Sequence, residues 1–80
     1  MNVVWKSDLC EILDLDGGNN MRMYCEGISQ SREDHLLDTL GVKYIIQSRT
    51  NGQFDGTLIL DFDKEDYKSV LSYFGEQNGR

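Results

Sequence analysis

Cys10, Cys25 and His35 carry the side chains of this sequence that most often serve as nucleophiles, general bases or zinc ligands. No serine or cysteine stands beside His35 in a motif typical of a nucleophile–base pair, although such pairs also assemble from distant segments. A zinc site needs four ligands, and the chain holds only two cysteines and one histidine. We therefore interpret His35 as a surface or helix-end residue and expect no catalytic and no metal-binding residues.

The segment 14–19, DLDGGN, has some of the acids of a calcium-binding loop. An EF-hand loop needs glycine at its sixth position and glutamate at its twelfth. Counted from Asp14, those positions hold Asn19 and Cys25. The lysine and the Ser/Thr of a phosphate-binding loop are also missing. The glycine pair is instead typical of a tight hairpin turn, and we expect no cofactor.

Acidic residues dominate the charge of the chain. Fourteen Asp and Glu residues outnumber eight Lys and Arg residues, which gives a net charge of −6. Such a surface repels nucleic acid, because affinity for nucleic acid comes mainly from Lys and Arg that neutralise phosphates. The charge therefore favours a basic protein as partner, for example a nucleic-acid-handling enzyme. Solubility alone is the other explanation.

The acids are densest around the end of one predicted strand. Asp61 and Asp63 lie on the same side of this strand, and a helix start follows. One interpretation is a solvated strand edge with helix capping. The other is a negative patch, spaced like phosphates, that occupies a basic groove of a partner. Acid–base catalysis would need a cleft and unlike environments, which the pattern does not indicate. The residues that we predict to contact a partner are Asp55, Asp61, Asp63, Glu65, Asp66, Ile45 and Ile59.

Eighty residues predict one domain, which we place at 1–75 with a flexible C-terminal tail at 76–80. A chain of this size buries only about 60–65% of its unfolded surface, so its core is thin and a deep catalytic cleft is not expected. No apolar run approaches the ~18–20 residues of a membrane span. The N-terminal residues lack the pattern of a signal peptide. We therefore expect a cytoplasmic protein with no membrane contact.

The first third of the chain predicts three strands. Asn2–Lys6 is β-prone and suits an edge strand, and Leu9–Leu15 and Met21–Gly27 form a hairpin. The turn between them sets Cys10 opposite Cys25. We expect these cysteines to be reduced core residues, with a strained cross-strand disulfide as the alternative. The apolar face of this hairpin would contain Cys10, Ile12, Met21, Met23 and Cys25.

Two helices are predicted. The first spans Ser29–Leu40, with Ser31 as N-cap and Gly41 as a left-handed C-cap. The second follows the cap residue Asp63 and ends at Gly75. Their apolar stripes consist of Leu36, Leu37 and Leu40 in the first, and Tyr67, Val70, Leu71 and Phe74 in the second.

A second hairpin over Gly41–Asp63 lies between these helices. Matching its apolar faces pairs Val42 with Phe62, Tyr44 with Leu60, and Ile46 with Leu58. A longer loop or a bulge near Phe54–Gly56 is needed for this register. The predicted fold class is α+β: a small antiparallel sheet of two hairpins, in the order (β)ββαββα, with two short helices packed on one face.

Residues 33–74 resemble the C-terminal dimerisation domain of ParB-type chromosome-partition proteins. That family shows a short helix, a glycine, a strand, a G-x-(I/L)-x-(I/L)-x-F strand and a helix with an acidic start. The resemblance implies a homodimer formed through the hairpin and the last helix. The family's hairpin is rich in lysine and contacts DNA, whereas this one keeps only Lys43 and Arg49, so DNA binding is not carried over. The matching residues are Leu37, Leu40, Gly41, Val42, Gly56, Leu58, Leu60, Phe62, Glu65, Asp66, Val70 and Leu71.

The sequence thus favours a non-enzymatic, acidic protein-binding module. A phage or mobile-element inhibitor of the anti-CRISPR, anti-restriction or antitoxin kind would fit, occupying a basic nucleic-acid-binding surface of its partner. The alternative is a homodimerisation module that resembles the ParB C-terminal domain, with Ile45 and Ile59 at the interface. A small enzyme is a third class.

Overall fold

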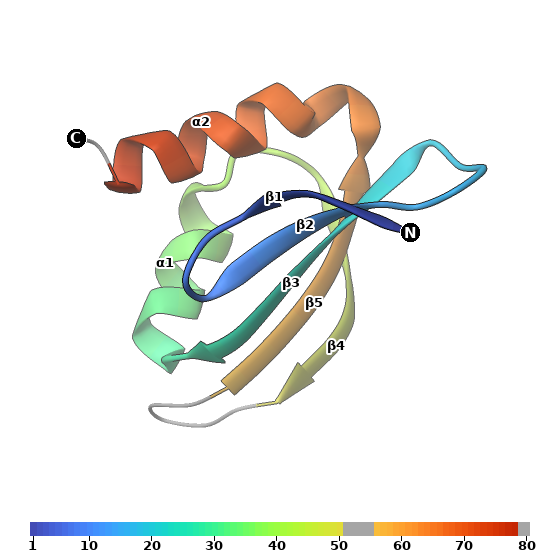
Figure 1. The fold of residues 1–80 in the computed structure, drawn as a ribbon. Helices are drawn as coiled ribbons and strands as arrows, with labels where there is room; N and C mark the ends of the chain where they lie inside the picture. Colours follow the sequence, from blue (N-terminus) through green and yellow to red (C-terminus); the bar gives the residue numbers. More distant parts are fainter. Residues whose placement is uncertain (51–55, 79–80) are drawn as a thin grey trace.

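A computed structural model describes residues 1–50 and 56–78 of the chain. Five strands form one antiparallel sheet, and both helices lie on the same face of it (Figure 1). This confirms the predicted α+β class and element order. The elements are β1 (Asn2–Lys6), β2 (Cys10–Asp14), β3 (Asn20–Ile28), α1 (Gln30–Thr39), β4 (Tyr44–Thr50), β5 (Gly56–Asp63), a 3-10 turn at Lys64–Asp66, and α2 (Tyr67–Asn78).

The sheet has the strand order β1-β2-β3-β5-β4. β1 and β4 are therefore the edge strands, as expected for β1. The chain leaves β3, passes through α1 to the far edge at β4, and returns through β5 between β4 and β3. This places the second hairpin directly beside the first. No helix of the described residues is long and apolar enough to cross a membrane.

The register of the first hairpin is the predicted one. Ile12 pairs with Met23 and Leu13 pairs with Arg22. Cys10 lies opposite Cys25, their Cα atoms are 4.1 Å apart, and a disulfide joins them. The expectation of reduced cysteines is therefore wrong, because direct cross-strand opposition brings the two thiols within bonding reach.

The core lies between the inner face of the sheet and the two helices. The inner faces of β2, β3 and β5 supply apolar side chains that are almost completely buried, and Val70 of α2 is buried with them. Burial of this apolar surface is the main force that holds the helices on the sheet. The core residues are Cys10, Ile12, Met21, Met23, Cys25, Ile28, Leu36, Leu40, Leu58, Leu60, Phe62, Val70, Tyr73 and Phe74.

The N-cap of helix α1 lies two residues earlier than predicted. The Ser29 hydroxyl accepts a hydrogen bond from the Arg32 amide, so Ser29 is the N-cap and the prediction of Ser31 is wrong. Ser31 lies inside the helix, because β3 ends at Ile28 and the helix already begins at Gln30. Gly41 has a φ of +79°, the left-handed conformation predicted for the end of this helix.

The register of the second hairpin differs from the predicted one by two residues. Tyr44 pairs with Phe62 and Ile46 pairs with Leu60. A two-residue slip keeps every side chain on the same face, so the apolar pattern alone could not distinguish the two registers. The bulge lies in β4 between Ile46 and Ser48. The predicted alternative near Phe54–Gly56 falls largely outside the described residues.

Helix α2 is longer than predicted. Asp63 caps the 3-10 turn that precedes it, as expected, and its side chain accepts a hydrogen bond from the Glu65 amide. The helix continues through Gly75 to Asn78, so Gly75 does not end it and the predicted tail begins within the helix. Tyr73, which the predicted stripe did not include, is also buried, beside Phe74.

Candidate protein-binding site

Asp61 lies on the outer face of the sheet, the face that the helices do not cover. The β3–β5 register sets it opposite Arg22. Arg22 donates two hydrogen bonds to the carboxylate, from Nε to Oδ1 at 2.7 Å and from Nη2 to Oδ2 at 3.1 Å. The Gln47 amide donates a third to Oδ2 at 3.1 Å. Asp61 is only 7% exposed, so it offers no free charge to a partner, in contrast to its predicted role.

The ion pair with Asp61 also stabilises the charged form of Arg22. Its hydrogen bonds to Asp61 raise the pKa of the guanidinium above its usual value. The bulge in β4 turns Gln47 onto this face beside Ser48, where it reaches the carboxylate. The centre of the outer face is thus a neutral, hydrogen-bonded network of Arg22, Asp61 and Gln47.

Asp63, two residues further along β5, is exposed. Glu65 is also exposed and Asp66 is half-buried, and both lie in the 3-10 turn after the strand. The turn of the first hairpin lies against this turn, because the Lys64 amide donates to the Asn19 carbonyl at 2.8 Å. The acids of both segments therefore gather at one end of the sheet: Asp14, Asp16, Asp63, Glu65 and Asp66, named here the acidic end.

Two acids of the acidic end already have a cationic neighbour. Lys64 Nζ lies 3.1 Å from Asp14 Oδ1, and the N-terminal ammonium lies 3.0 Å from Asp16 Oδ2. No ion pair is formed by Asp63, Glu65 or Asp66 with the residues that the structure describes. These three carboxylates are the ones that remain available to a basic partner.

A groove of about 540 Å³ lies at the start of β4, next to the acidic end. Its walls combine apolar side chains and three carboxylates with one amide, Asn20, and one ammonium group, Lys43. The lining residues are Asn20, Val42, Lys43, Tyr44, Ile45, Asp61, Phe62, Asp63 and Asp66. We call this the acidic groove. It brings together four of the predicted partner-binding residues, namely Ile45, Asp61, Asp63 and Asp66. Ile45 is 64% exposed, so it offers apolar surface at the edge of the groove.

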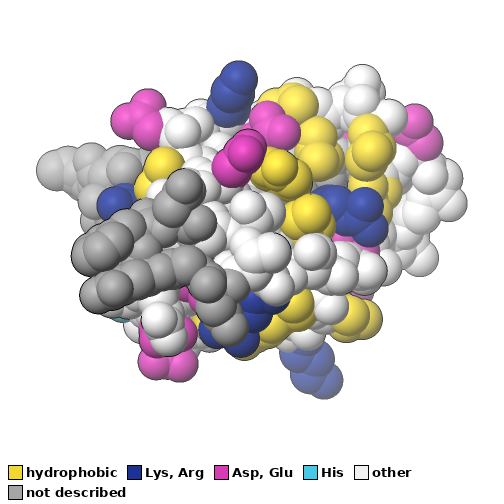
Figure 2. All heavy atoms as spheres, turned by 90° about the horizontal axis from the view of Figure 1, so that it is seen from below, with side chains coloured by type: hydrophobic (Ala, Val, Ile, Leu, Met, Phe, Trp, Pro, Cys, Tyr) yellow, Lys and Arg dark blue, Asp and Glu magenta, His cyan; other side chains and the backbone are white. Residues whose placement is uncertain are grey.

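Ile59 lies outside the groove. It is half-buried on the outer face of β5, between Tyr24 of β3 and Ser48 of β4. Figure 2 views the molecule from below, and apolar side chains gather over the right half of this view with basic and acidic side chains between them. Asp55, the seventh predicted residue, lies outside the described residues.

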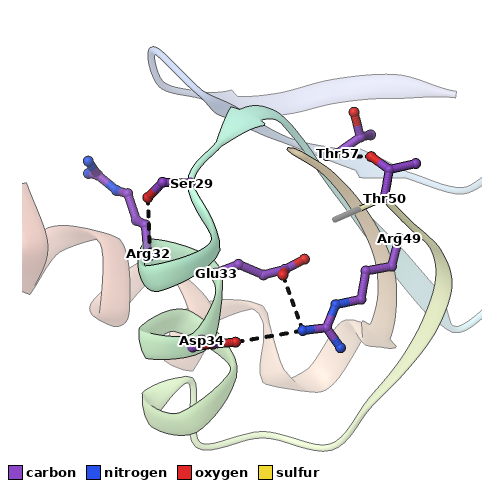
Figure 3. A network of polar contacts seen from close by, with 7 residues as sticks. All are labelled: Ser29, Arg32, Glu33, Asp34, Arg49, Thr50 and Thr57. Carbon is purple, nitrogen blue, oxygen red and sulfur yellow. Dashed lines mark hydrogen bonds and ion pairs between the residues drawn. The ribbon is translucent and has the colours of Figure 1, made fainter. Parts of the chain in front are cut away.

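A second buried carboxylate lies on the opposite face of the sheet. Glu33 of α1 is 3% exposed, and its Oε1 accepts a hydrogen bond from Arg49 Nη2 at 3.1 Å (Figure 3). The same nitrogen lies 3.6 Å from Asp34 Oδ1. The bulge at Gln47 turns Arg49 inward, toward α1. Within the described residues, Glu33 Oε2 has no hydrogen-bond partner.

Cys10, Cys25 and His35 were considered as possible nucleophile, base or metal-ligand residues. Both cysteines are held in the disulfide, so the chain has no free thiol that His35 could activate. His35 is exposed on α1, with its ring centre 6.3 Å from that of Tyr73. Over residues 1–50 and 56–75, no three His, Cys, Asp or Glu side chains come close enough together to hold a metal ion.

Comparison with protein-family models, with curated proteins and with solved structures finds no match to this chain. The resemblance of residues 33–74 to the ParB dimerisation domain therefore stays a prediction. The function must be argued from the groove, the charges and the open face of the sheet.

Sequence reasoning missed the apolar wall of the acidic groove. Val42, Tyr44 and Phe62 were predicted as core residues, and Phe62 is indeed buried, but Val42 and Tyr44 are only half-buried. The ion pair between Arg22 and Asp61 was also missed, because it forms only if β3 and β5 pair with each other. No local signal in the sequence predicts which strands pair.

Proposed function

We propose that this chain is a non-enzymatic protein-binding module whose acidic groove takes a basic side chain of its partner. The observation that carries the proposal is the meeting of exposed Ile45 with Asp63 and Asp66 around one groove. A Lys or Arg side chain has an apolar stem and a cationic head. The stem would lie against the apolar wall while the head pairs with a carboxylate.

The charge of the whole chain supports the same partner. A net charge of −6 steers a basic protein toward this surface and repels nucleic acid. Asp63 and Asp66 would set the orientation, while the neutral network around Asp61 supports the strand beneath them. The chain would act by occupying a surface of its partner and would not transform a substrate.

The test is affinity capture from a host lysate at low and at high salt. The full chain is compared with an Asp63→Asn/Asp66→Asn variant. Asparagine is as good an N-cap as aspartate, so the turn before α2 is kept. We expect a basic protein that elutes at high salt and that the variant fails to retain. The control is Asp38→Asn, which removes one exposed charge of α1 outside the groove.

Three outcomes would contradict the proposal. The first is the absence of any basic protein that elutes with salt. The second is equal retention by the chain and by the Asp63→Asn/Asp66→Asn variant. The third is loss of retention in the Asp38→Asn control, which would show that net charge, and not the groove, binds the partner.

The proposal has two forms, which differ in the cellular compartment of the chain and therefore in the class of its partner. In the cytoplasm the partner would be a nucleic-acid-handling enzyme, and the chain would be an inhibitor of the anti-CRISPR, anti-restriction or antitoxin kind. The Cys10–Cys25 disulfide is instead typical of oxidising compartments, where the partner would be a secreted or surface protein. Alkylation of thiols in freshly lysed cells distinguishes the two, since only reduced chains gain the mass of the alkylating group.

A second candidate function is homodimerisation through the open face of the sheet. It is favoured by one observation: no described element covers this face, which carries exposed Val3 and Ile45 and half-buried Ile59. Uncovered apolar side chains on a sheet are a common basis for subunit contacts. Sedimentation at high concentration tests this function. A strict monomer would remove it and leave the first proposal untouched.

A further inference from the structure

A second cavity, of about 480 Å³, opens where the β1–β2 turn meets both helices. It shares no lining residue with the acidic groove. Its volume falls within the roughly 300–1,000 Å³ typical of small-molecule sites. The lining residues are Ser7, Asp8, Leu9, Cys10, Ile28, Arg32, Leu36, Tyr73 and Phe74.

The inner wall of this cavity is apolar and rigidly held. Ile28 and Leu36 are 2% exposed each, and Phe74, which lines the cavity beside them, is 7% exposed. Cys10 is tied to β3 by its disulfide with Cys25. The Phe74 ring is itself fixed by Trp5, whose ring centre lies 4.5 Å away. These contacts keep the wall in place without a ligand, which lowers the entropic cost of binding.

Arg32 gives the mouth of the cavity a positive charge. It lies in the first turn of α1, where the helix dipole disfavours a cation. Within residues 1–50 and 56–75, Arg32 forms no ion pair. The neighbouring acids Glu33 and Asp34 face Arg49 instead (Figure 3). An anion held here would interact favourably with both the guanidinium and the helix end.

Three further polar side chains line the same cavity: Ser7, Asp8 and Tyr73. The Ser7 hydroxyl already hydrogen-bonds to the backbone of Cys10. Burial raises the pKa of the Tyr73 hydroxyl, against smaller lowering effects of Thr39 and Arg32, so this hydroxyl stays protonated at neutral pH. Asp8 is exposed, and its charge opposes an anion. An anion with an apolar part would therefore suit Arg32 and the apolar wall, and the charge of Asp8 would weaken its binding.

We propose that this cavity binds a small organic acid with an apolar body, of the size of a medium-chain carboxylate. The carboxylate pairs with Arg32 at the mouth, and the apolar body lies against Ile28, Leu36 and Phe74. The site is independent of the acidic groove, so it can be occupied in the free chain and in a complex with a partner.

The test is a titration of the full, oxidised chain with sodium octanoate, followed by amide chemical shifts. Octanol and octylammonium serve as probes of the same length without the negative charge. We expect saturable shifts at Ile28, Leu36 and Phe74 below the micellar concentration of octanoate, with affinity at least about fivefold higher than for either control probe. Shifts that do not saturate, or that centre elsewhere, would overturn the proposal.

Two charge variants make the test specific. Arg32→Gln should weaken octanoate about fivefold and leave octanol unchanged, whereas Asp8→Asn should tighten octanoate about twofold. Both side chains are exposed, so we expect both variants to fold, and far-ultraviolet circular dichroism checks this. Equal octanoate affinity in the wild-type chain and in Arg32→Gln would contradict the assignment of Arg32.

Discussion

Asp61 and Asp63 lie two residues apart on the same face of β5, yet they occupy opposite environments. Asp61 faces Arg22, accepts three side-chain hydrogen bonds and is 7% exposed. Asp63 faces Asn20, is exposed, and accepts one hydrogen bond, from the Glu65 amide. The cross-strand neighbour, and not the residue type, therefore decides whether a carboxylate stabilises the sheet or stays available to a partner.

The largest effect is expected from Asp61→Ala. This change leaves Arg22 without its partner in a half-buried site. Breaking a buried ion pair costs about 3–5 kcal/mol, and the partial exposure of Arg22 puts the expected loss of unfolding free energy near the lower limit, at about 3 kcal/mol. Urea denaturation measures the loss. A loss as small as that of Asp63→Asn would contradict the division between the two aspartates.

Replacing both members of this pair sharpens the first prediction. An Arg22→Leu/Asp61→Leu variant leaves no unpaired charge on the outer face, so it should lose less stability than Asp61→Ala. A double variant that is as unstable as the single one would show that Asp61 acts by some means other than pairing with Arg22.

Glu33→Gln should have the next largest effect, about 1–2 kcal/mol. Glu33 is even more buried than Asp61, but the described residues give it only one hydrogen-bonded oxygen and one half-exposed cation, Arg49. Its amide analogue keeps the shape and can still accept from Arg49. Thermal or urea unfolding, with Asp38→Asn as the exposed control on the same helix, measures the difference. A loss greater than that of Asp61→Ala would reverse the order of the two pairs.

Asp63→Ala should cost about 1 kcal/mol, because it removes the cap before α2. Asp63→Asn should cost much less, since asparagine also caps. The comparison of these two variants separates the capping role of Asp63 from its charge. If Asp63→Asn were as destabilising as Asp63→Ala, the charge of Asp63 would itself hold the fold, as it does at Asp61.

The smallest effect concerns a buried hydroxyl and appears only at high pH. Burial raises the pKa of Tyr73 above the value near 10 of an unfolded tyrosine. Its contribution to stability is therefore complete below about pH 10 and is lost as the pH rises through the folded pKa. As the pH rises above about 10, a Tyr73→Phe variant should lose less stability than the wild-type chain. Identical pH profiles in urea unfolding would contradict this.

Much of the fold followed from local sequence signals. The glycine-containing turn fixed the first hairpin and its register, and Asp63 and Gly41 marked helix ends correctly. The second register was missed because a two-residue slip leaves the apolar face unchanged. Ser29 and Ser31 are equivalent as caps in sequence, and only the exit of the chain from β3 decides between them.

The candidate site was predictable only in part. The density of acids around the end of β5 indicated Asp63 and Asp66 as partner-binding residues. The alternation of side chains along β4 indicated that Ile45 points away from the helices. The pairing of Asp61 with Arg22 could not be predicted, because β3 and β5 are separated in the sequence by α1 and β4 and pair only in the folded sheet. Non-local strand pairing of this kind has no sequence signature.

The most direct measurement of the central claim is an amide-shift titration of the chain with a capped hexa-arginine peptide. The account predicts saturable shifts centred on Val42, Ile45 and Phe62, which weaken with salt and are lost in Asp63→Asn/Asp66→Asn but not in Asp38→Asn. Shifts spread evenly over all exposed acids, or unchanged in the groove variant, would contradict the claim that this groove selects basic side chains.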